Sequence, residues 1–346
     1  MSEFSIYTVT PRQSRILVRD ALYAGLVPYL HSSPGIGKSS IMATVANDLN
    51  LAVIDHRLST SGPEDMSGLP GFREDGRAVF KPFADLFPLE GDAVPEGKDG
   101  WMLFLDEMPA AIKQVQAASF KLILDRMTGQ HRLNQRCVIT AAGNLMSDRS
   151  IVNSISTGMQ SRLIHLEMVA DFNEWLLDVA IPENYDHRVI AYLSQYPNKL
   201  MDFNPSHANK TFCCPRTWEF ANKLVKTCGV GDDKTALYTG CMTPTVAIEF
   251  LAFTKCYASI VTFAELIQDP ENCRLPHDNN GKWATISSMM EHITDGNFEK
   301  AATYAGRFDI PFRVLFFRMV MVYQPKLRRH PAFAKEMVTL QNYLME

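Results

Sequence analysis

The chain has 346 residues, of which 46% are hydrophobic and 21% charged, and its formal net charge is −4. A chain of this length can bury a large core divided over two or three subdomains, and the composition is that of a soluble globular protein. The acidic balance argues against a protein whose main task is to bind a phosphate backbone.

Three features of the sequence bear on its cellular location. The first residues, Met1–Ile6, lack a basic flank and a long apolar run, so we expect no signal peptide. The apolar stretch Val314–Val322 contains Arg318 and is about half as long as a membrane span requires. Seven cysteines form no Cys-x-x-Cys pair, and even the neighbours Cys213 and Cys214 fit buried, reduced thiols better than a disulfide or metal site. We therefore expect a cytoplasmic protein.

Short β-like runs alternate with helical patterns through the first half of the chain. One helical pattern precedes the first run, and others follow the first and third runs. This alternation implies crossover connections and a mostly parallel, buried sheet. The predicted strands are Val27–His31, Ala52–Leu58, Trp101–Asp106, Cys137–Ala142 and Arg162–Met168, and the predicted helices are Pro11–Ala24, Lys38–Leu49 and Ile112–Leu124.

The pattern changes after about Asp171, where amphipathic helical sequence replaces the β-like runs. Residues 171–226, 244–268 and 285–346 all have this character. Clusters of Gly, Asp, Asn and Pro at residues 229–233 and 269–281 indicate turns between them. The sequence therefore predicts an α/β nucleotide-binding type of core followed by a helical half.

The strongest chemical signal is the segment Ser33-Pro34-Gly35-Ile36-Gly37-Lys38-Ser39, followed by Ser40, between the first predicted strand and its helix. A glycine-rich turn lets backbone N–H groups surround phosphates, and the helix adds its positive amino end. We expect Lys38 to reach the β- and γ-phosphates and Ser39 to bind Mg²⁺. The motif departs from its consensus at one position, where Ser32 replaces the first glycine.

A second signal is the apolar strand Trp101–Leu105, which ends in the adjacent carboxylates Asp106 and Glu107. Taken alone, such a pair would be the N-cap of the next helix. Together with the phosphate loop, it predicts that Asp106 holds the metal through Ser39 or water and that Glu107 is the general base. The next strand ends in Ala142-Gly143-Asn144, and we expect Asn144 to orient the attacking water with Glu107.

Two arginines complete the predicted site. Arg162 opens the last predicted strand after a loop and short helix, where it can reach the γ-phosphate of a neighbouring subunit. Arg149 and Arg126 are competing candidates, and Arg149 is the more serious one. Arg216 lies near the start of a helix in the second half and is expected to fold over the phosphates, with a surface ion pair as the alternative.

The ordered set of motifs resembles the AAA+ ATPases and, more narrowly, their MoxR-like branch. The resemblance covers roughly residues 12–225 and weakens towards the end of the chain. It implies Walker A and B roles for Lys38, Ser39, Asp106 and Glu107, sensor 1 for Asn144, an arginine finger at Arg162 and sensor 2 at Arg216. The motifs that carry it are the phosphate loop, Pro63–Pro70, Leu105–Glu107, Ala142–Asn144, Ser161-Arg162 and Pro215–Trp218.

The resemblance also implies an architecture. It predicts an α/β AAA+ core with a parallel five-stranded sheet over residues 1–170, a helical lid over 171–235 and a helical region over 236–346. Residues 63–80 resemble the helix-2 insertion of the branch, and Met127–Arg136 resembles its hairpin before the fourth strand. Both are candidate substrate contacts near the pore of a ring. For adenine we expect contacts from the segment near Tyr7–Arg12.

By the same resemblance, the chain is expected to bind Mg²⁺ and ATP, to form a hexameric ring, and to remodel a protein partner in a chaperone-like way. Relatives often work beside a protein with a von Willebrand A domain. Two alternatives stay open. A nucleic-acid-directed motor would need a basic channel, for which the predicted hairpin offers His131, Arg132 and Arg136. A nucleotide-gated scaffold would hydrolyse ATP slowly.

Overall fold

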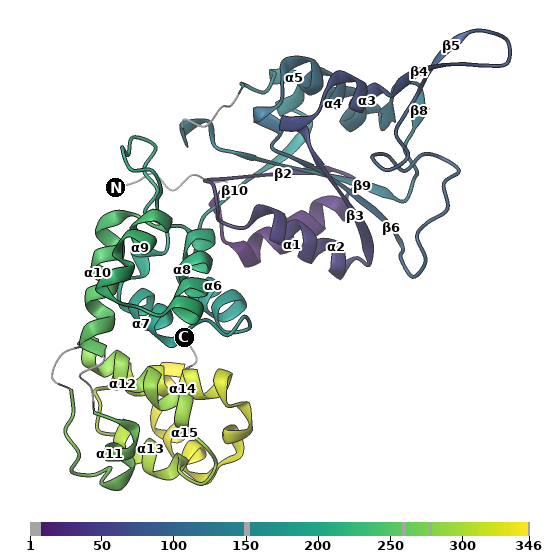
Figure 1. Ribbon diagram of the computed structural model, residues 1–346. Coiled ribbons are helices and arrows are strands. Elements are labelled where there is room, and N and C mark those ends of the chain that lie inside the picture. Colours follow the sequence, from purple (N-terminus) through teal and green to yellow (C-terminus); the bar gives the residue numbers. More distant parts are fainter. Residues whose placement is uncertain (1–7, 149–152, 258–260, 277–278, 345–346) are drawn as a thin grey trace. The chain divides into compact units, whose positions relative to one another are not determined.

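The computed structural model describes residues 8–148, 153–257, 261–276 and 279–344 (Figure 1). The chain divides into two compact units. The first contains residues up to Asp171 together with Phe203–His207, and the second contains Phe172–Asp202 and the residues from Ala208 onward. The predicted division of the second half at residue 235 stays a prediction.

The first unit is built on a six-stranded sheet in the order β1-β10-β2-β9-β6-β3, in which every neighbouring pair is parallel. All five predicted strands form. The sequence analysis missed β1, whose two residues pair with the end of β10 and are too few to show a pattern. The bounds are β1 Thr8–Val9, β2 Val27–Ser32, β3 Leu51–Arg57, β6 Gly100–Asp106, β9 Cys137–Asn144 and β10 Leu163–Met168.

Helices cover both faces of this sheet (Figure 1), which explains why every residue of β6 is buried. Side chains of a strand alternate between faces. Met102 and Phe104 accordingly pack in the cluster that includes Val18 and Val45 of the helices on one face, while Leu103 and Leu105 pack with the opposite face. The first face carries α1 (Pro11–Tyr23) and α2 (Lys38–Asp48), and the second carries α3 (Pro63–Ser67), α4 (Lys113–Asp125) and α5 (Thr157–Gln160).

Two antiparallel hairpins occupy the segments that resemble the insertions. They are β4 (Leu69–Phe72) with β5 (Ala78–Lys81), and β7 (Met127–Thr128) with β8 (His131–Arg132). The first extends away from the sheet (Figure 1). His131 Nε2 lies 2.9 Å from the carbonyl oxygen of Phe80, so the turn end of the β7–β8 hairpin contacts strand β5 of the first hairpin.

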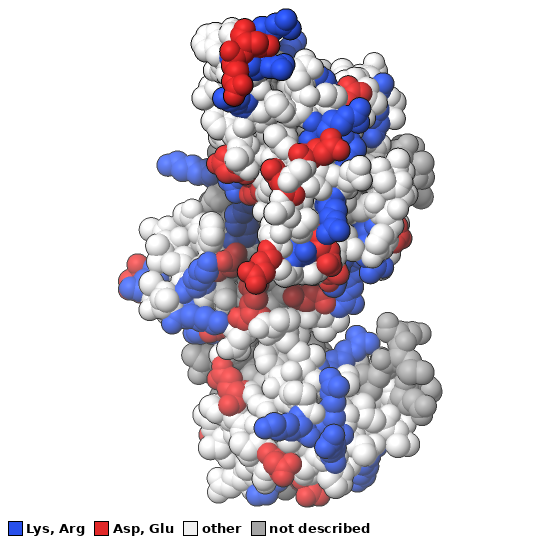
Figure 2. Space-filling model, turned by 90° about the vertical axis from the view of Figure 1, so that its right-hand side faces the viewer, with Lys and Arg blue, Asp and Glu red and all other residues white. Residues whose placement is uncertain are grey.

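The charges on the molecular surface are of both signs. Figure 2 shows Lys and Arg side chains interspersed with Asp and Glu on the face that it displays. At the tip of the first hairpin, Arg73 and Arg77 lie 3.9 and 3.8 Å from the carboxylate of Asp75. The hairpin tip therefore carries ion pairs instead of unpaired positive charge.

The second unit is helical in all its described regular elements, as the sequence predicts. Its first half packs around aromatic side chains, with Trp218 and Phe250 both in contact with Tyr192. Its helices are α6 (Phe172–Trp175, continued by a π-helical turn to Ala180), α7 (His187–Gln195), α8 (Pro215–Cys228), α9 (Thr235–Cys241), α10 (Pro244–Tyr257), α11 (Phe263–Gln268), α12 (Asn279–His292), α13 (Phe298–Ala305), α14 (Ile310–Tyr323) and α15 (Pro331–Leu344).

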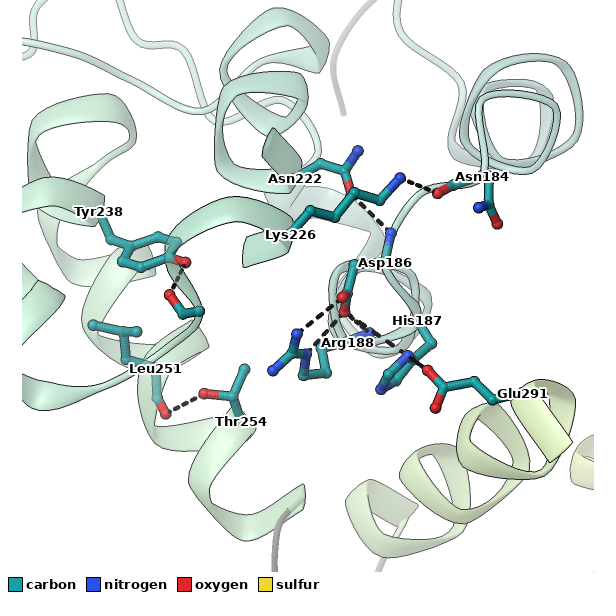
Figure 3. Close-up of polar contacts among 11 residues, drawn as sticks. Asn184, Asp186, His187, Arg188, Asn222, Lys226, Tyr238, Leu251, Thr254 and Glu291 are labelled. Atoms are coloured by element: carbon teal, nitrogen blue, oxygen red, sulfur yellow. Dashed lines mark hydrogen bonds and ion pairs between the residues drawn. The ribbon is translucent and has the colours of Figure 1, made fainter. Parts of the chain in front are cut away.

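A polar network at the start of α7 ties three helices together (Figure 3). The carboxylate of Asp186 accepts two hydrogen bonds of 2.9 Å from the Arg188 guanidinium, and the Asp186 N–H donates to the side-chain oxygen of Asn222 on α8 at 2.7 Å. His187 Nδ1 contacts the carboxylate of Glu291 on α12. Burial lowers the pKa of His187, although the neighbouring carboxylates of Asp186 and Glu291 act to raise it.

The described residues offer two further observations on the expectations above. No helix among them is both long and apolar enough to cross a membrane. The six cysteines whose side chains are described are free thiols, and Cys213 and Cys214 are buried. Burial, with Asp202 nearby, raises the pKa of Cys213 to about 12.

Candidate nucleotide-binding site

The predicted phosphate loop, Ser33–Gly37, connects the end of β2 to the first residue of α2, Lys38. Two of its glycines have left-handed backbones, with φ of 81° at Gly35 and 109° at Gly37. A residue with a Cβ adopts such angles only at a cost. No side chain caps the amino end of α2, so its first N–H groups are available to an anion, which the helix dipole also favours. The loop has the features that bind phosphate.

Lys38 points back over the loop towards the end of β9. Its Nζ lies 2.9 Å from Oδ1 of Asn144, 2.9 Å from Oγ of Ser32 and 3.2 Å from the Ser32 carbonyl oxygen. The two side chains meet because β2 and β9 are neighbours and Ser32 pairs with Asn144 in the register of the sheet. The structure therefore brings Lys38 and Asn144, two of the predicted site residues, together.

Ser32 explains how the loop tolerates its departure from the consensus. Ser32 is the last residue of β2 and is fully buried. It is absent from the described residues with positive φ, so its backbone does not need glycine. Its hydroxyl donates to the Ser33 carbonyl at 2.8 Å and accepts from Lys38. The hydroxyl of Ser32 thus serves as a hydrogen-bond acceptor for the ammonium group of Lys38.

The proposed metal ligands also lie together. Oγ of Ser39 is 3.2 Å from Oδ2 of Asp106, which is buried at the end of β6. Burial raises the pKa of Asp106, and hydrogen bonds from the Glu107 N–H and the Ser39 hydroxyl oppose this only in part. A desolvated carboxylate beside a hydroxyl is a set of hard oxygen donors that suits Mg²⁺. The residues present therefore fit the metal that the sequence implies.

Glu107 has a strained backbone and a partner that the sequence analysis missed. Its φ is 55°, in the left-handed region that non-glycine residues rarely adopt. Its carboxylate accepts a short hydrogen bond from the hydroxyl of Ser59. Ser59 lies in a short 3-10 helix, Leu58–Thr60, that follows β3. Strand β3 pairs with β6 so that Arg57 is opposite Asp106. Only this strand pairing identifies Ser59, since no motif marks it.

Gly143 allows the end of β9 to pack closely beside this carboxylate segment. A Cβ built on Gly143 would lie 2.3 Å from Cδ of Pro109 and 2.6 Å from the hydroxyl oxygen of Tyr29. Neither distance is possible for real atoms, so a larger residue would push β9 away from the turn after Glu107. The glycine in Ala142-Gly143-Asn144 thus has a packing role that fixes where Asn144 lies.

Arg162 lies at the amino ends of the strands, whereas the phosphate loop follows the carboxyl end of β2. It is exposed and directly precedes β10, whose first residue, Leu163, pairs with Val27 at the amino end of β2. The six residues of β2 span about 20 Å, which exceeds the reach of an arginine side chain. The guanidinium donates to the Gly158 carbonyl and lies 4.6 Å from the centre of the Phe120 ring. Arg162 therefore cannot contact phosphates in its own loop.

The other predicted arginines have different surroundings. Arg126 donates from its guanidinium to the carbonyl oxygens of Asn134 and Cys137, which assigns it to holding the β7–β8 hairpin segment. Arg149 lies outside the described residues. Arg216 is exposed in the first turn of α8, in the second unit. Its role over the phosphates stays a prediction.

Comparisons with known proteins add little to this geometry. No protein-family model and no curated protein matches the chain. Among solved structures, it is similar to a predicted ATPase from Cytophaga hutchinsonii, at 12% identity over 94% of this chain and 79% of that one, with a TM-score of 0.36. It is also similar to a full-length MCM homolog from Methanopyrus kandleri, at 15% identity over 45% of this chain and 34% of that one, with a TM-score of 0.30. The chain's own residues therefore carry the evidence for its function.

Proposed function

We propose that this chain is an AAA+-type ATPase of the MoxR-like kind, which hydrolyses Mg·ATP in a ring and remodels a protein partner. One observation carries the proposal. Residues from distant parts of the chain converge at the carboxyl edge of one parallel sheet, which is where open α/β sheets bind ligands. They are Lys38, Ser39, Asp106, Glu107 and Asn144.

Lys38 and α2 would bind the phosphates of ATP. Neutral oxygens of Ser32, Ser33 and Asn144 accept hydrogen bonds from the lysine. A charged phosphate oxygen is a stronger partner for an ammonium than a neutral oxygen, so binding would move Lys38 from these acceptors to the nucleotide. Ser39 and Asp106 would hold Mg²⁺, whose charge offsets that of the phosphates when bound.

Glu107 would accept the proton of the attacking water, and the amide of Asn144 would orient that water once Lys38 has turned to the phosphates. In the structure the Glu107 carboxylate already accepts the hydroxyl of Ser59. The hydroxyl occupies a carboxylate oxygen that would otherwise accept from the attacking water. Ser59 would therefore restrain the base until it is released.

The position of Arg162 supports assembly. The arginine is exposed at the amino edge of the sheet, too far from its own phosphate loop, so it could complete a catalytic site only in a second copy of the chain. This arrangement favours a closed ring, for which the family resemblance suggests six subunits. If Arg149→Ala abolished turnover while Arg162→Ala turned over normally, Arg149 would be the trans-acting residue.

The hairpins favour a protein partner over nucleic acid. The β4–β5 hairpin exposes apolar side chains, with 77% of Phe72 and 49% of Phe80 accessible to solvent, while its tip arginines pair with Asp75. On the second hairpin, Arg132 is exposed and keeps the nucleic-acid alternative open. A von Willebrand A protein is the partner that the resemblance suggests.

The experiment is ATP binding and phosphate release by wild type, Lys38→Ala and Glu107→Gln. We expect Lys38→Ala to lose binding, and Glu107→Gln to bind but not hydrolyse. If both variants still hydrolysed ATP, the assignment of these residues would be rejected.

A second experiment tests the nucleic-acid alternative. Binding to single-stranded and duplex DNA is measured at two salt concentrations, because phosphate contacts weaken steeply with salt. A tight, salt-dependent affinity would replace the protein-remodelling proposal with the nucleic-acid motor.

A further inference from the structure

Two histidines connect the strand that leads into the phosphate loop with the helix that precedes Arg162. His31, on β2, has its Nε2 2.8 Å from Nδ1 of His165 on β10. The rings are nearly parallel, at 25° and with centroids 5.1 Å apart. Nε2 of His165 lies 2.9 Å from the carbonyl oxygen of Gln160, the last residue of α5. A continuous line of hydrogen bonds thus runs from β2 to α5.

The direction of each hydrogen bond follows from its last acceptor. A carbonyl oxygen can only accept, so Nε2 of His165 carries a hydrogen, and we assign its Nδ1 as the acceptor of the bond from His31. His31 must then donate from its own Nε2. Burial, the neighbouring His165 and Lys38 lower the pKa of His31 to about 4, so His31 is neutral at pH 7. Both rings therefore have their hydrogen on Nε2.

Both ends of this line meet residues of the proposed catalytic machinery. His31 directly precedes Ser32, whose oxygens accept from Lys38. At the other end, three successive backbone carbonyls of α5 accept hydrogen bonds from the residues that follow the helix. The Gly158 carbonyl accepts the Arg162 guanidinium, the Met159 carbonyl accepts the Arg162 N–H at 3.0 Å, and the Gln160 carbonyl accepts His165.

The ring of Tyr29 packs against both histidines. The Tyr29 ring is fully buried, with its centroid 3.9 Å from that of His31 and 5.6 Å from that of His165. A displacement of β2 would therefore move His31 and His165 together, because close-packed side chains transmit small shifts. Three ring nitrogens of the two histidines take part in hydrogen bonds here. Apolar side chains could fill the same space without needing any hydrogen-bond partner.

We propose that His31 and His165 are positioning residues that couple the phosphate loop of one subunit to the Arg162 segment that this subunit presents to its neighbour. The inference rests on the proposed ATPase function. A change at Ser32 and Lys38 on nucleotide binding would pass through the histidines to the end of α5, where the carbonyl that holds Arg162 lies two residues from the one that holds His165.

The test compares two substitutions at one position. His31→Gln places an amide N–H near the Nε2 position and keeps a donor for His165, whereas His31→Phe keeps the ring and loses the donor. We expect His31→Phe to lower ATP turnover of the assembled protein about tenfold with unchanged nucleotide binding by the subunit, and His31→Gln to keep at least about half of the wild-type rate. Val18→Ala, in the core on the other face, controls for a general loss of stability.

A double-mutant cycle separates coupling from a structural effect. If the histidines act through Arg162, His31→Phe has no further effect on turnover in an Arg162→Ala background. Effects that multiply, or a turnover in His31→Gln as low as in His31→Phe, would overturn the coupling. Turnover in the wild type is measured first, and its absence would reject the proposed function itself.

A readout independent of activity is the histidine tautomer, observed by nitrogen NMR of the imidazoles at pH 7. We expect the hydrogen on Nε2 of both His31 and His165, with each signal assigned by its loss in the corresponding Gln variant. A hydrogen on Nδ1 of His165 would contradict the hydrogen-bonded line, whatever the activity of the protein.

Discussion

The ammonium group of Lys38 lies 2.9 Å from the amide oxygen of Asn144, which is 106 residues further along the chain. The contact joins the first residue of α2 to the last residue of β9. The amide oxygen of Asn144 is thus engaged by the residue proposed to bind phosphate. In the proposed function, phosphate binding would release this oxygen before Asn144 orients the attacking water.

Substitutions at Asn144 test that order. Asn144→Ala removes one neutral acceptor from Lys38, so nucleotide affinity should stay close to wild type while turnover falls about 10- to 100-fold. Asn144→Asp should weaken nucleotide binding, because a carboxylate would hold the ammonium in an ion pair. Binding of a fluorescent ATP analogue and phosphate release measure the two effects. Wild-type turnover in Asn144→Ala would exclude Asn144 from catalysis.

Ser59→Ala removes the hydroxyl that the Glu107 carboxylate accepts. Because that hydroxyl occupies a carboxylate oxygen of the proposed general base, we expect basal ATP turnover to rise severalfold, by about the worth of one hydrogen bond to a charged group. Ser59→Thr keeps a hydroxyl and serves as the matched control. A fall in turnover with unchanged binding would mean instead that Ser59 holds Glu107 in its productive position.

Gly143→Ala should destabilise the first unit, because its Cβ would overlap Pro109 and Tyr29. The cost of such overpacking is about 1–3 kcal/mol, measured by urea unfolding, and turnover should fall as Asn144 shifts. Gly240→Ala is the control. Gly240 lies within α9 with open space around its Cα, so alanine there should be neutral or stabilising by up to about 1 kcal/mol. Equal stability of the two variants would contradict the packing described for Gly143.

The half-buried His31 makes stability depend on pH. Its pKa is about 4 in the folded chain, below the value of 6.5 that is usual for histidine. Between these values the unfolded chain binds a proton that the folded chain does not, so stability is full above pH 6.5 and falls as the pH drops. From pH 7 to pH 5 the loss is about 2 kcal/mol, and His31→Gln should lack this part of it. Identical pH dependence in the two proteins would show that His31 titrates normally.

Features encoded by local sequence could be predicted. The phosphate loop and its flanking elements follow from glycines between an apolar run and a helical pattern, and β6 follows from its continuous apolar sequence. The position of the Asp106–Glu107 pair beside Ser39 then follows from the geometry of parallel sheets, whose strand ends meet at one edge. The predicted helix Lys38–Leu49 ends one residue earlier in the structure, at Asp48.

Features set by strand order and register could not be predicted. Ser59 and Glu107 meet only because β3 pairs with β6, and His31 and His165 meet only because β10 pairs with β2. Arg126, the lesser of the two competing candidates, could be assigned only from its bonds to two backbone carbonyls. Ser32 looked like a defect in the motif, although its extended backbone needs no glycine.

The most direct test of the ATPase account is the mass of the Glu107→Gln variant by light scattering, with and without Mg·ATP, alongside turnover of the wild type. This variant should bind ATP without consuming it, so the assembled state persists. We predict a shift from smaller species to a ring when Mg·ATP is added, with turnover in the wild type alone. A mass unchanged by Mg·ATP together with no turnover in the wild type would contradict the account.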